Sequence, residues 1–240
     1  MGLIPALLGF SLLAAPPPQS SNDETTGANL LLSGKYREAI PYFARLVARQ
    51  PQDPYHYLNR AECYRHVSDH RAAVQDYNRF IALYPTYASK NDNVPAGLAN
   101  AHLRRGQQYA HLELDNLAIQ DGSDAIAWYQ KARTVAGTEY QKSQSAPAEK
   151  VADAYQLRGD AYHNLKQDVR ALEEYNQALR LNPRDSYIFC NAGLARLALG
   201  QDAKAQEDFD RAIRLDPDRK SIVDQMIRFH KQGKVVRLYP

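Results

Sequence analysis

The sequence is short of the residues on which disulfide-linked and metal-bound domains depend. It contains two cysteines, two methionines and one tryptophan among 240 residues. Neither cysteine belongs to a Cys-x-x-Cys pair or to a cluster with histidine, so no metal site is predicted. The chain also lacks a glycine-rich phosphate loop, an H-E-x-x-H motif and a G-x-S-x-G motif. These absences predict a protein that is not an enzyme and that needs no cofactor.

The chain also lacks a large excess of charge of either sign. The formal net charge is only +3, so no global electrostatic field points to a nucleic-acid partner. Hydrophobic residues make up 44% of the chain and charged residues 24%, which is ordinary for a globular protein. We therefore expect no specific nucleic-acid binding.

One long apolar run extends from Leu3 to Ala15, and three prolines follow it. It is too short to span a bilayer comfortably, and its length suits the apolar core of a secretory signal. No Lys or Arg precedes the run and no Ala-x-Ala site marks a cleavage point, while the absence of a following cysteine excludes a bacterial lipoprotein signal. We expect residues 1–19 to direct export to the periplasm or another extracytoplasmic space. The alternative is a cytoplasmic protein with a misassigned start or an ordered apolar cap.

The dominant feature is a 34-residue unit that occurs twice in succession, at Ala152–Asp185 and Ser186–Arg219. A fixed period of this length is the signature of a repeat array. When the copies are superposed, small, aromatic and proline residues coincide in the pairs Gly159/Gly193, Ala171/Ala205, Tyr175/Phe209, Ala178/Ala212 and Pro183/Pro217.

The spacing within each copy predicts two amphipathic helices joined by a polar turn, because apolar residues recur at intervals of three and four. The small residues let the paired helices approach closely, and the aromatic residue fills the space beside them. Pro183 and Pro217 are predicted to end the second helix, since proline lacks a backbone donor and clashes with the preceding turn. One pair cannot bury its apolar face alone, so the units must stack. Cys63 and Cys190 would then lie several repeats apart, too far for a disulfide.

These units resemble the tetratricopeptide repeat (TPR) family. The resemblance implies an all-α, right-handed α-α superhelix of about five helix pairs with a C-terminal capping helix. The predicted segments are a signal-like and proline-rich stretch at 1–19, repeats 1 and 2 at 20–87, an insertion at 88–98, a degenerate repeat 3 with an extended second helix at 99–135, a polar linker at 136–151, repeats 4 and 5 at 152–219, and a capping helix with a basic tail at 220–240. Whether the insertions bend or hinge the array is left open.

The predicted capping helix has an apolar face that includes Val223 and Met226 and a charged opposite face, as the end of a solenoid requires. Gly233 is predicted to end it. From Arg219 onward the tail carries six basic residues against one acid, Asp224. Contact with anionic lipid or RNA is one interpretation. We favour the other, a solvated helix with a frayed end, so membrane contact is expected only through this tail or the N-terminal apolar segment.

In the resembled family the first helix of each pair lines an inner groove that commonly binds a peptide. Transfer of these positions predicts groove contacts at Tyr55, Asn59, Glu62, Arg65, Arg104, Gln107, Gln156, Asp160, His163 and Tyr187. Tyr55 and Tyr187 share the second position of their repeats, where a large aromatic residue suits a ligand anchor. His163 recurs with two other first-helix histidines, but equivalent positions of neighbouring repeats lie about 10 Å apart, too far to share one metal ion.

Chaperone-binding members of the family grip a C-terminal carboxylate through Lys, Asn and Arg side chains from three repeats. Only Asn59 and Arg104 meet those positions, whereas Glu24, Ala28 and Asn100 do not. We therefore predict no such clamp. Asn59 and Arg104 remain predicted contacts for a peptide backbone or an acidic side chain.

The sequence thus predicts a non-catalytic adaptor or scaffold that holds a peptide segment of another protein in its concave groove. The alternative is a structural or assembly factor that acts through its convex face, its ends or homo-oligomerisation. The identity of the partner and the oligomeric state are left open by the sequence.

Overall fold

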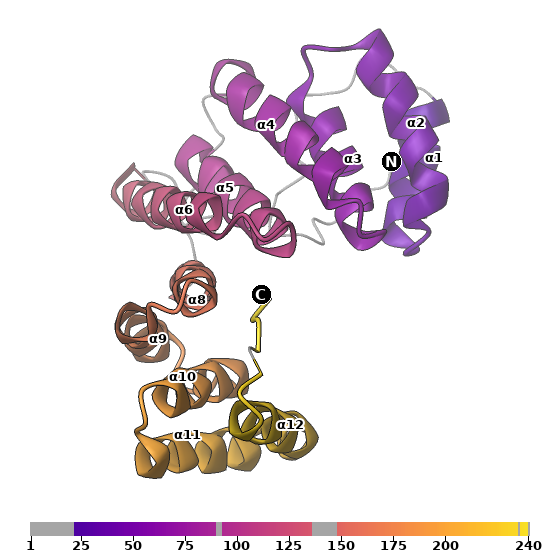
Figure 1. Cartoon of the computed structure of the whole chain (residues 1–240). Coiled ribbons are helices and arrows are strands. Elements are labelled where there is room, and N and C mark those ends of the chain that lie inside the picture. Colours follow the sequence, from indigo (N-terminus) through magenta and orange to yellow (C-terminus); the bar gives the residue numbers. More distant parts are fainter. Residues whose placement is uncertain (1–21, 90–92, 136–147, 235, 240) are drawn as a thin grey trace.

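The computed structural model describes residues 22–89, 93–135, 148–234 and 236–239. In these residues the chain forms five helix pairs that follow one another around an arc, and α12 closes its C-terminal end (Figure 1). The elements are α1 (Asn22–Leu32), α2 (Tyr36–Arg49), α3 (Pro54–His66), α4 (His70–Tyr87), α5 (Val94–His111), α6 (Asp115–Val135), α8 (Ala148–Asn164), α9 (Asp168–Leu181), α10 (Ser186–Ala198), α11 (Asp202–Leu215), the 3-10 turn η1 (Pro217–Arg219) and α12 (Lys220–Lys231). The predicted all-α superhelix of helix pairs is confirmed. The signal-like segment 1–19 lies outside the described residues.

The ends of several helices follow from identifiable residues. Asp53 and Asp185 cap α3 and α10, and each carboxylate accepts a backbone N–H two residues later at 2.9 Å. The helices α9 and α11 both end before a proline, Pro183 and Pro217, as predicted. The repeat boundaries are therefore set by capping and by the proline stop.

Within a pair, the two helices approach at a small residue that faces an aromatic ring. A methyl group on Gly159 would lie 2.5 Å from the ring of Tyr175, and one on Gly193 would lie 2.6 Å from that of Phe209. Both rings are buried. Since these distances are shorter than a van der Waals contact, any larger residue would push the helices apart. The predicted roles of the small and aromatic positions are confirmed.

Repeat 3 departs from this scheme because Gly122 stands where the other repeats have an aromatic residue. The next repeat fills the space. A methyl group on Gly106 would lie 2.7 Å from Leu157, and one on Gly122 would lie 2.6 Å from Arg158. Both contacting side chains belong to α8, so α8 packs directly on both helices of repeat 3.

The interruptions in the array are shorter than the composition predicts. The segment 88–98 was expected to lie outside the repeats, but α4 extends to Tyr87 and α5 already begins at Val94. The predicted linker 136–151 is shortened in the same way, because α8 begins at Ala148.

Pro85 lies inside α4 instead of ending it. The helix continues because tertiary packing offsets the backbone hydrogen bond that proline cannot donate. Tyr84 is buried, its ring stacks on Phe80 at a centroid distance of 4.7 Å, and a methyl group on Gly97 of α5 would lie 2.3 Å from it. The last turn of α4 is thus clamped between its own preceding turn and α5.

Arginine–carboxylate pairs join the two helices of the middle repeats. Each links an arginine on the first helix to an acid sixteen residues later on the second, in the pairs Arg60–Asp76, Arg105–Asp121 and Arg158–Glu174. The acids are buried and the arginine side chains are partly exposed. Because the loss of one partner would leave a buried charge, these pairs hold the helices in register.

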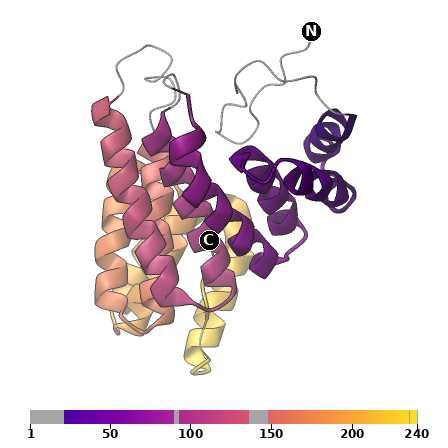
Figure 2. The same cartoon turned by 90° about the horizontal axis from the view of Figure 1, so that it is seen from above.

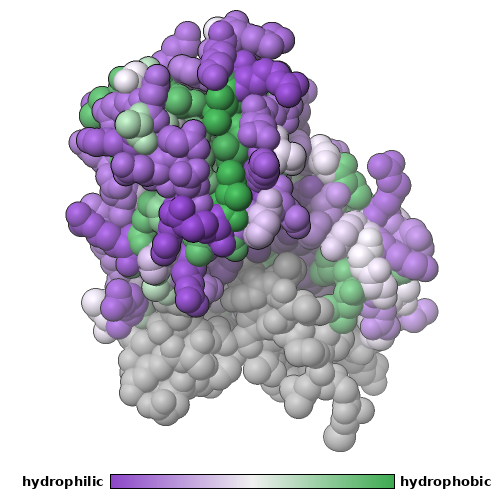
Figure 3. All heavy atoms as spheres, turned by 90° about the horizontal axis from the view of Figure 1, so that it is seen from below, coloured by the Kyte–Doolittle hydropathy of each residue, from purple (hydrophilic) through white to green (hydrophobic). Residues whose placement is uncertain are grey.

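The cap α12 closes the last repeat. Val223 and Met226 are buried in the core of repeats 4 and 5, while Asp224 and Arg228 are exposed. Figure 3 looks at the molecule from the side of α11 and α12, where the surface is mostly hydrophilic with a narrow apolar stripe. Gly233, with a φ of +66°, ends the helix as predicted and turns the chain back. Among the described residues, no helix is both long and apolar enough to cross a membrane.

Candidate functional site

A pocket of about 640 Å³, which we call the groove pocket, lies between first helices of the later repeats and the C-terminal elements. The helices α5, α8 and α10 form one side, and α12 with the turn before it and the extended stretch after it form the other. The lining includes Gln107, Gln156, Tyr187, Cys190, Arg219 and Met226. Three of the predicted contacts, Gln107, Gln156 and Tyr187, therefore converge on one site.

Tyr187 presents an aromatic surface to this pocket and is 54% exposed. The guanidinium carbon of Arg219 lies 3.3 Å from the centre of its ring, and Arg219 Nε donates to Asp216 Oδ2 at 2.8 Å. The pair offers an aromatic face backed by a guanidinium whose charge Asp216 balances, which suits an aromatic or apolar group of a ligand. Cys190 forms part of the pocket wall, and burial raises the pKa of its thiol to about 11, so the thiol is uncharged at neutral pH.

The residues Val236–Tyr239, which we call the folded-back segment, lie extended inside the arc, as two perpendicular views agree (Figures 1 and 2). The side chain of Asn164, the last residue of α8, bonds both backbone groups of Leu238. Leu238 N donates to Asn164 Oδ1 and Asn164 Nδ2 donates to the Leu238 carbonyl, both at 2.9 Å. The arc thus holds an extended chain through its backbone.

Two side chains of the folded-back segment reach the place where α5 ends and α6 begins. The guanidinium of Arg237 donates to Asp115 Oδ2 at 2.8 Å, and its Nε lies 3.9 Å from Glu113. The ring of Tyr239 stacks on His111 with the centroids 5.4 Å apart. The sequence-based expectation of a frayed, solvated end is therefore wrong for these residues, because long-range contacts hold them.

The N-terminal part of the concave surface is occupied by contacts within the chain. Glu62 is fully buried and accepts hydrogen bonds from the Tyr77 hydroxyl at 2.5 Å and from Arg65 at 2.9 Å. Arg104 Nε lies 4.0 Å from the same carboxylate. Glu62 was predicted as a peptide contact, and its complete burial removes it from that set. Arg65 and Arg104 direct their charges at Glu62.

Tyr55 differs from Tyr187 although both occupy the same repeat position. Its ring lies edge-on to three rings of α4, those of Phe80, Tyr84 and Tyr87, with centroids 5.9 to 6.4 Å apart. It therefore packs against the core of repeat 2. Tyr55 and the half-buried Asn59 both lie on α3, and neither belongs to the lining of the groove pocket.

Asp160, another predicted contact, is fully buried as well. Its Oδ1 accepts hydrogen bonds from the Tyr175 hydroxyl and from Asn191 Nδ2, both at 2.8 Å. Both donors are uncharged, and burial raises the pKa of Asp160 to about 7. Asp160 is therefore unavailable to a ligand. His163 hydrogen-bonds to Asp168 and lines a second pocket of about 370 Å³, which shares Val236 with the groove pocket.

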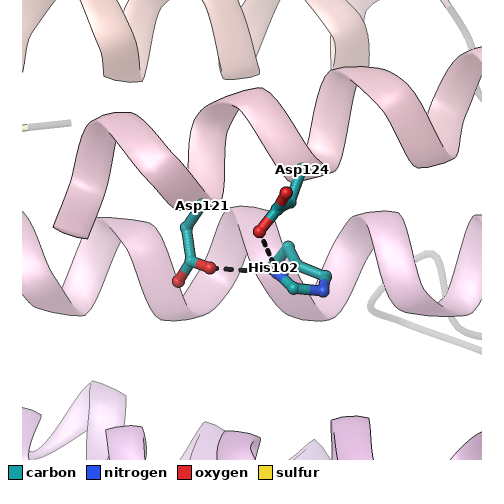
Figure 4. A group of neighbouring side chains, drawn as sticks. All are labelled: His102, Asp121 and Asp124. Carbon is teal, nitrogen blue, oxygen red and sulfur yellow. Dashed lines mark hydrogen bonds and ion pairs between the residues drawn. The ribbon is translucent and has the colours of Figure 1, made fainter.

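A possible cation site lies between α5 and α6, where His102, Asp121 and Asp124 meet (Figure 4). His102 Nδ1 lies 2.9 Å from Asp121 and 3.6 Å from Asp124. However, Arg105 donates to both oxygens of Asp121, at 2.6 and 2.8 Å. A guanidinium in this place neutralises the carboxylate that a cation would need, so we assign the cluster to the pairing of α5 with α6.

A sequence signal indicates that Glu62 and Asp160 are buried, and the prediction of peptide contacts did not use it. Glu62 lies fifteen residues before Tyr77, and Asp160 lies fifteen residues before Tyr175. Where the aromatic is phenylalanine, as at Phe209, the corresponding position holds an apolar residue, Leu194. An acid at this position thus accompanies a tyrosine hydroxyl. Asn164, Asp115 and His111 carry no comparable signal, because a segment distant in sequence creates their role.

The fold defines a helical-repeat protein whose concave side holds residues 236–239 of its own chain. Family profiles described as "Tetratricopeptide repeat", "TPR repeat" and "Tetratricopeptide repeat" match residues 28–88, 159–200 and 186–219, respectively. The chain belongs to the tetratricopeptide repeat family. As a member it is a protein-interaction module, and its partners are proteins.

Solved structures of similar fold include MamA from Desulfovibrio magneticus RS-1, with 19% identity and a TM-score of 0.66, covering 86% of this chain and 99% of that chain. A further crystal structure of MamA has 18% identity and a TM-score of 0.62, with coverages of 81% and 96%. YrrB, described as a TPR protein with an unusual peptide-binding site, has 14% identity and a TM-score of 0.61, with coverages of 88% and 92%. Identities this low establish a shared fold alone.

Proposed function

We propose that the chain is a non-catalytic adaptor that binds an extended peptide segment of a partner protein at the groove pocket. The observation that carries the proposal is that the side-chain amide of Asn164 hydrogen-bonds to both the N–H and the C=O of Leu238, a residue of the folded-back segment that itself lines the groove pocket. A side-chain amide that pairs with a whole backbone unit favours an extended peptide whatever its side chains. The groove pocket continues from this point toward α10 and α12.

The lining of the groove pocket supports a ligand with mixed chemistry. Gln107 and Gln156 supply further side-chain amides for backbone groups, while Tyr187, stacked on Arg219, supplies an aromatic face. Met226 adds a flexible apolar contact. Such a combination of a few polar groups with apolar walls is typical of peptide and small-ligand sites.

The test is a selection of displayed random peptides on the full chain, followed by affinity measurements on variants. Tyr187→Ala and Gln156→Ala are expected to weaken the selected peptides on the order of tenfold each, because central anchors carry most of the binding energy. Gln177→Ala, at an exposed position of α9, is the matched control and is expected to change nothing. Peptides that bind all variants equally would refute the groove assignment and favour a role through the convex face or the ends.

A further inference from the structure

We propose that the folded-back segment occupies the binding site of a partner peptide with the same order of side chains, a basic residue, an apolar residue and an aromatic residue. The segment competes with this peptide from within the chain. The proposal rests on the proposed function and adds the chemistry of the ligand and an internal competitor.

The first support is that the side-chain amide of Asn164 has a fixed orientation. Its Nδ2 donates to Asp115 Oδ1 at 3.1 Å as well as to the carbonyl of Leu238. A buried carboxylate from a neighbouring repeat thereby fixes the amide in the position that bonds an extended backbone. Such a second partner makes Asn164 a preorganised receptor group instead of a chance contact.

The second support is the charge of the site. Asp115 is buried, and its Oδ2 receives the guanidinium of Arg237 at 2.8 Å, with Glu113 nearby at 3.9 Å. A buried carboxylate is costly unless a cation or several donors compensate it. A peptide that displaces the folded-back segment must therefore supply a basic side chain in the same place.

The third support is the surface that receives the next two side chains. Leu238 is 6% exposed and lies in the apolar core of repeats 4 and 5. Tyr239 stacks on His111, and His111 stacks on His70 at a centroid distance of 4.4 Å. The site thus offers an apolar socket followed by a platform of stacked rings, which selects an apolar and then an aromatic residue.

The folded-back segment is suited to competition because its attachment is short. Gly233 turns the chain directly after α12, so the segment is tethered close to its site. A short tether gives an effective concentration on the order of millimolar, which blocks a weak ligand and yields to a strong one. The tethered segment therefore sets a threshold of affinity for partners.

The experiment uses the full chain and a fluorescein-labelled peptide with the sequence of residues 234–240. The double variant Arg237→Glu, Leu238→Asp weakens the internal contacts and leaves the receptor residues intact. It is expected to bind the peptide on the order of tenfold more tightly than the wild type, because the internal competitor is removed. The control Gln225→Asp, Arg228→Glu makes the same charge change at exposed positions of α12 and is expected to behave as the wild type.

Receptor variants are then added to the Arg237→Glu, Leu238→Asp background. Asn164→Ala is expected to abolish peptide binding. Asp115→Asn is expected to weaken the peptide on the order of fivefold, and to leave unchanged the affinity for a peptide in which methionine replaces the arginine. This difference reports the charge contact and would not arise from a general loss of structure, which circular dichroism checks independently.

Three results would overturn the proposal. One is equal binding of the peptide to the wild type and to the released variant, and another is no binding to the released variant. The third is that light scattering shows a dimer for the wild type and a monomer for the Arg237→Glu, Leu238→Asp variant. The segment in the site would then come from a second copy of the chain. Selected peptides that still require Tyr187 and Gln156 would leave the proposed function standing in each case.

Discussion

The two halves of the concave surface are built from equivalent repeat positions and differ in what those positions contact. In the N-terminal half, Tyr55 packs against the rings of α4 and Glu62 is enclosed with Arg65. In the C-terminal half, Tyr187 is exposed beside Arg219, and a pocket and an extended chain lie next to it. The first half is closed by its own side chains, whereas the second holds a pocket and the folded-back segment, where we propose that a ligand binds.

The difference arises from the ends of the second helices. The helix α4 passes through Pro85 and supplies Tyr84 and Tyr87 to cover Tyr55. The helix α11 ends before Pro217, and the 3-10 turn η1 that follows sets the Arg219 guanidinium over the ring of Tyr187, which stays exposed. Repeat position therefore predicts which way a side chain points, while the neighbouring helix end decides whether a ligand can reach it.

Substitution of the two buried carboxylates is expected to change the free energy of unfolding most. The sign of this change differs between the N-terminal and the C-terminal half. Glu62 lies beside two arginines, so Glu62→Gln should lower the free energy of unfolding at pH 8 by about 3 to 4 kcal/mol. Asp160 has only uncharged donors and a pKa of about 7, so Asp160→Asn should raise it at the same pH. The gain is at most about 4 kcal/mol, because each unit of pKa difference corresponds to about 1.4 kcal/mol.

The pH dependence gives a second check on Asp160. The folded carboxyl, with a pKa of about 7, retains its proton at pH values where the unfolded one has lost it. Wild-type stability relative to Asp160→Asn should therefore fall as the pH rises from about 4 to about 7, and stay constant above. Urea unfolding at several pH values measures this difference, and a difference that does not change with pH would contradict the assignment.

The next largest change in stability distinguishes Tyr55 from Tyr187. Tyr55→Ala should destabilise the fold by about 2 to 3 kcal/mol, because it removes a ring from a packed aromatic cluster. Tyr187→Ala should cost less than about 1 kcal/mol, since it loses mainly an exposed contact with Arg219. Thermal unfolding gives the stabilities and peptide titration gives the affinities. The comparison fails if Tyr187 proves the more important residue for stability.

The smallest change in stability is expected at the turn between the two helices of a repeat. A residue with positive φ occupies this turn in both halves. Ser68 has a φ of +61° at a position that is glycine in repeats 1 and 5. Ser68→Gly should raise the free energy of unfolding by about 0.5 to 1 kcal/mol, because the left-handed conformation costs a residue with a Cβ atom. Gly200→Ala, with a φ of +69°, should lower it by a similar amount. An unchanged midpoint of chemical unfolding for both would show that the turns carry no strain.

The repeat fold could be predicted because it depends on local, periodic features. Gly159, Tyr175 and Pro183 each act within one repeat, and their spacing is visible in the sequence. The exposure of Tyr187 and the enclosure of Tyr55 could not be predicted in this way, because they depend on where α4 and α11 end.

The folded-back segment shows most clearly what could not be predicted from the sequence. Arg237 and Leu238 belong to a tail whose composition predicts a solvated end. Their contacts with Asp115 and Asn164 join residues separated by 122 and 74 positions, respectively. No local pattern encodes such a pairing, since it exists only after the arc has formed and Gly233 has turned the chain.

The most direct test of the central claim is a map of amide chemical shifts during titration of a selected peptide into the full chain. We predict that the largest changes fall on α10, α12 and the side-chain amide of Asn164. We predict that the amides of α3 around Glu62 stay unchanged. Changes centred on α3, with α10 and α12 unaffected, would contradict the assignment of the open binding surface to the C-terminal half.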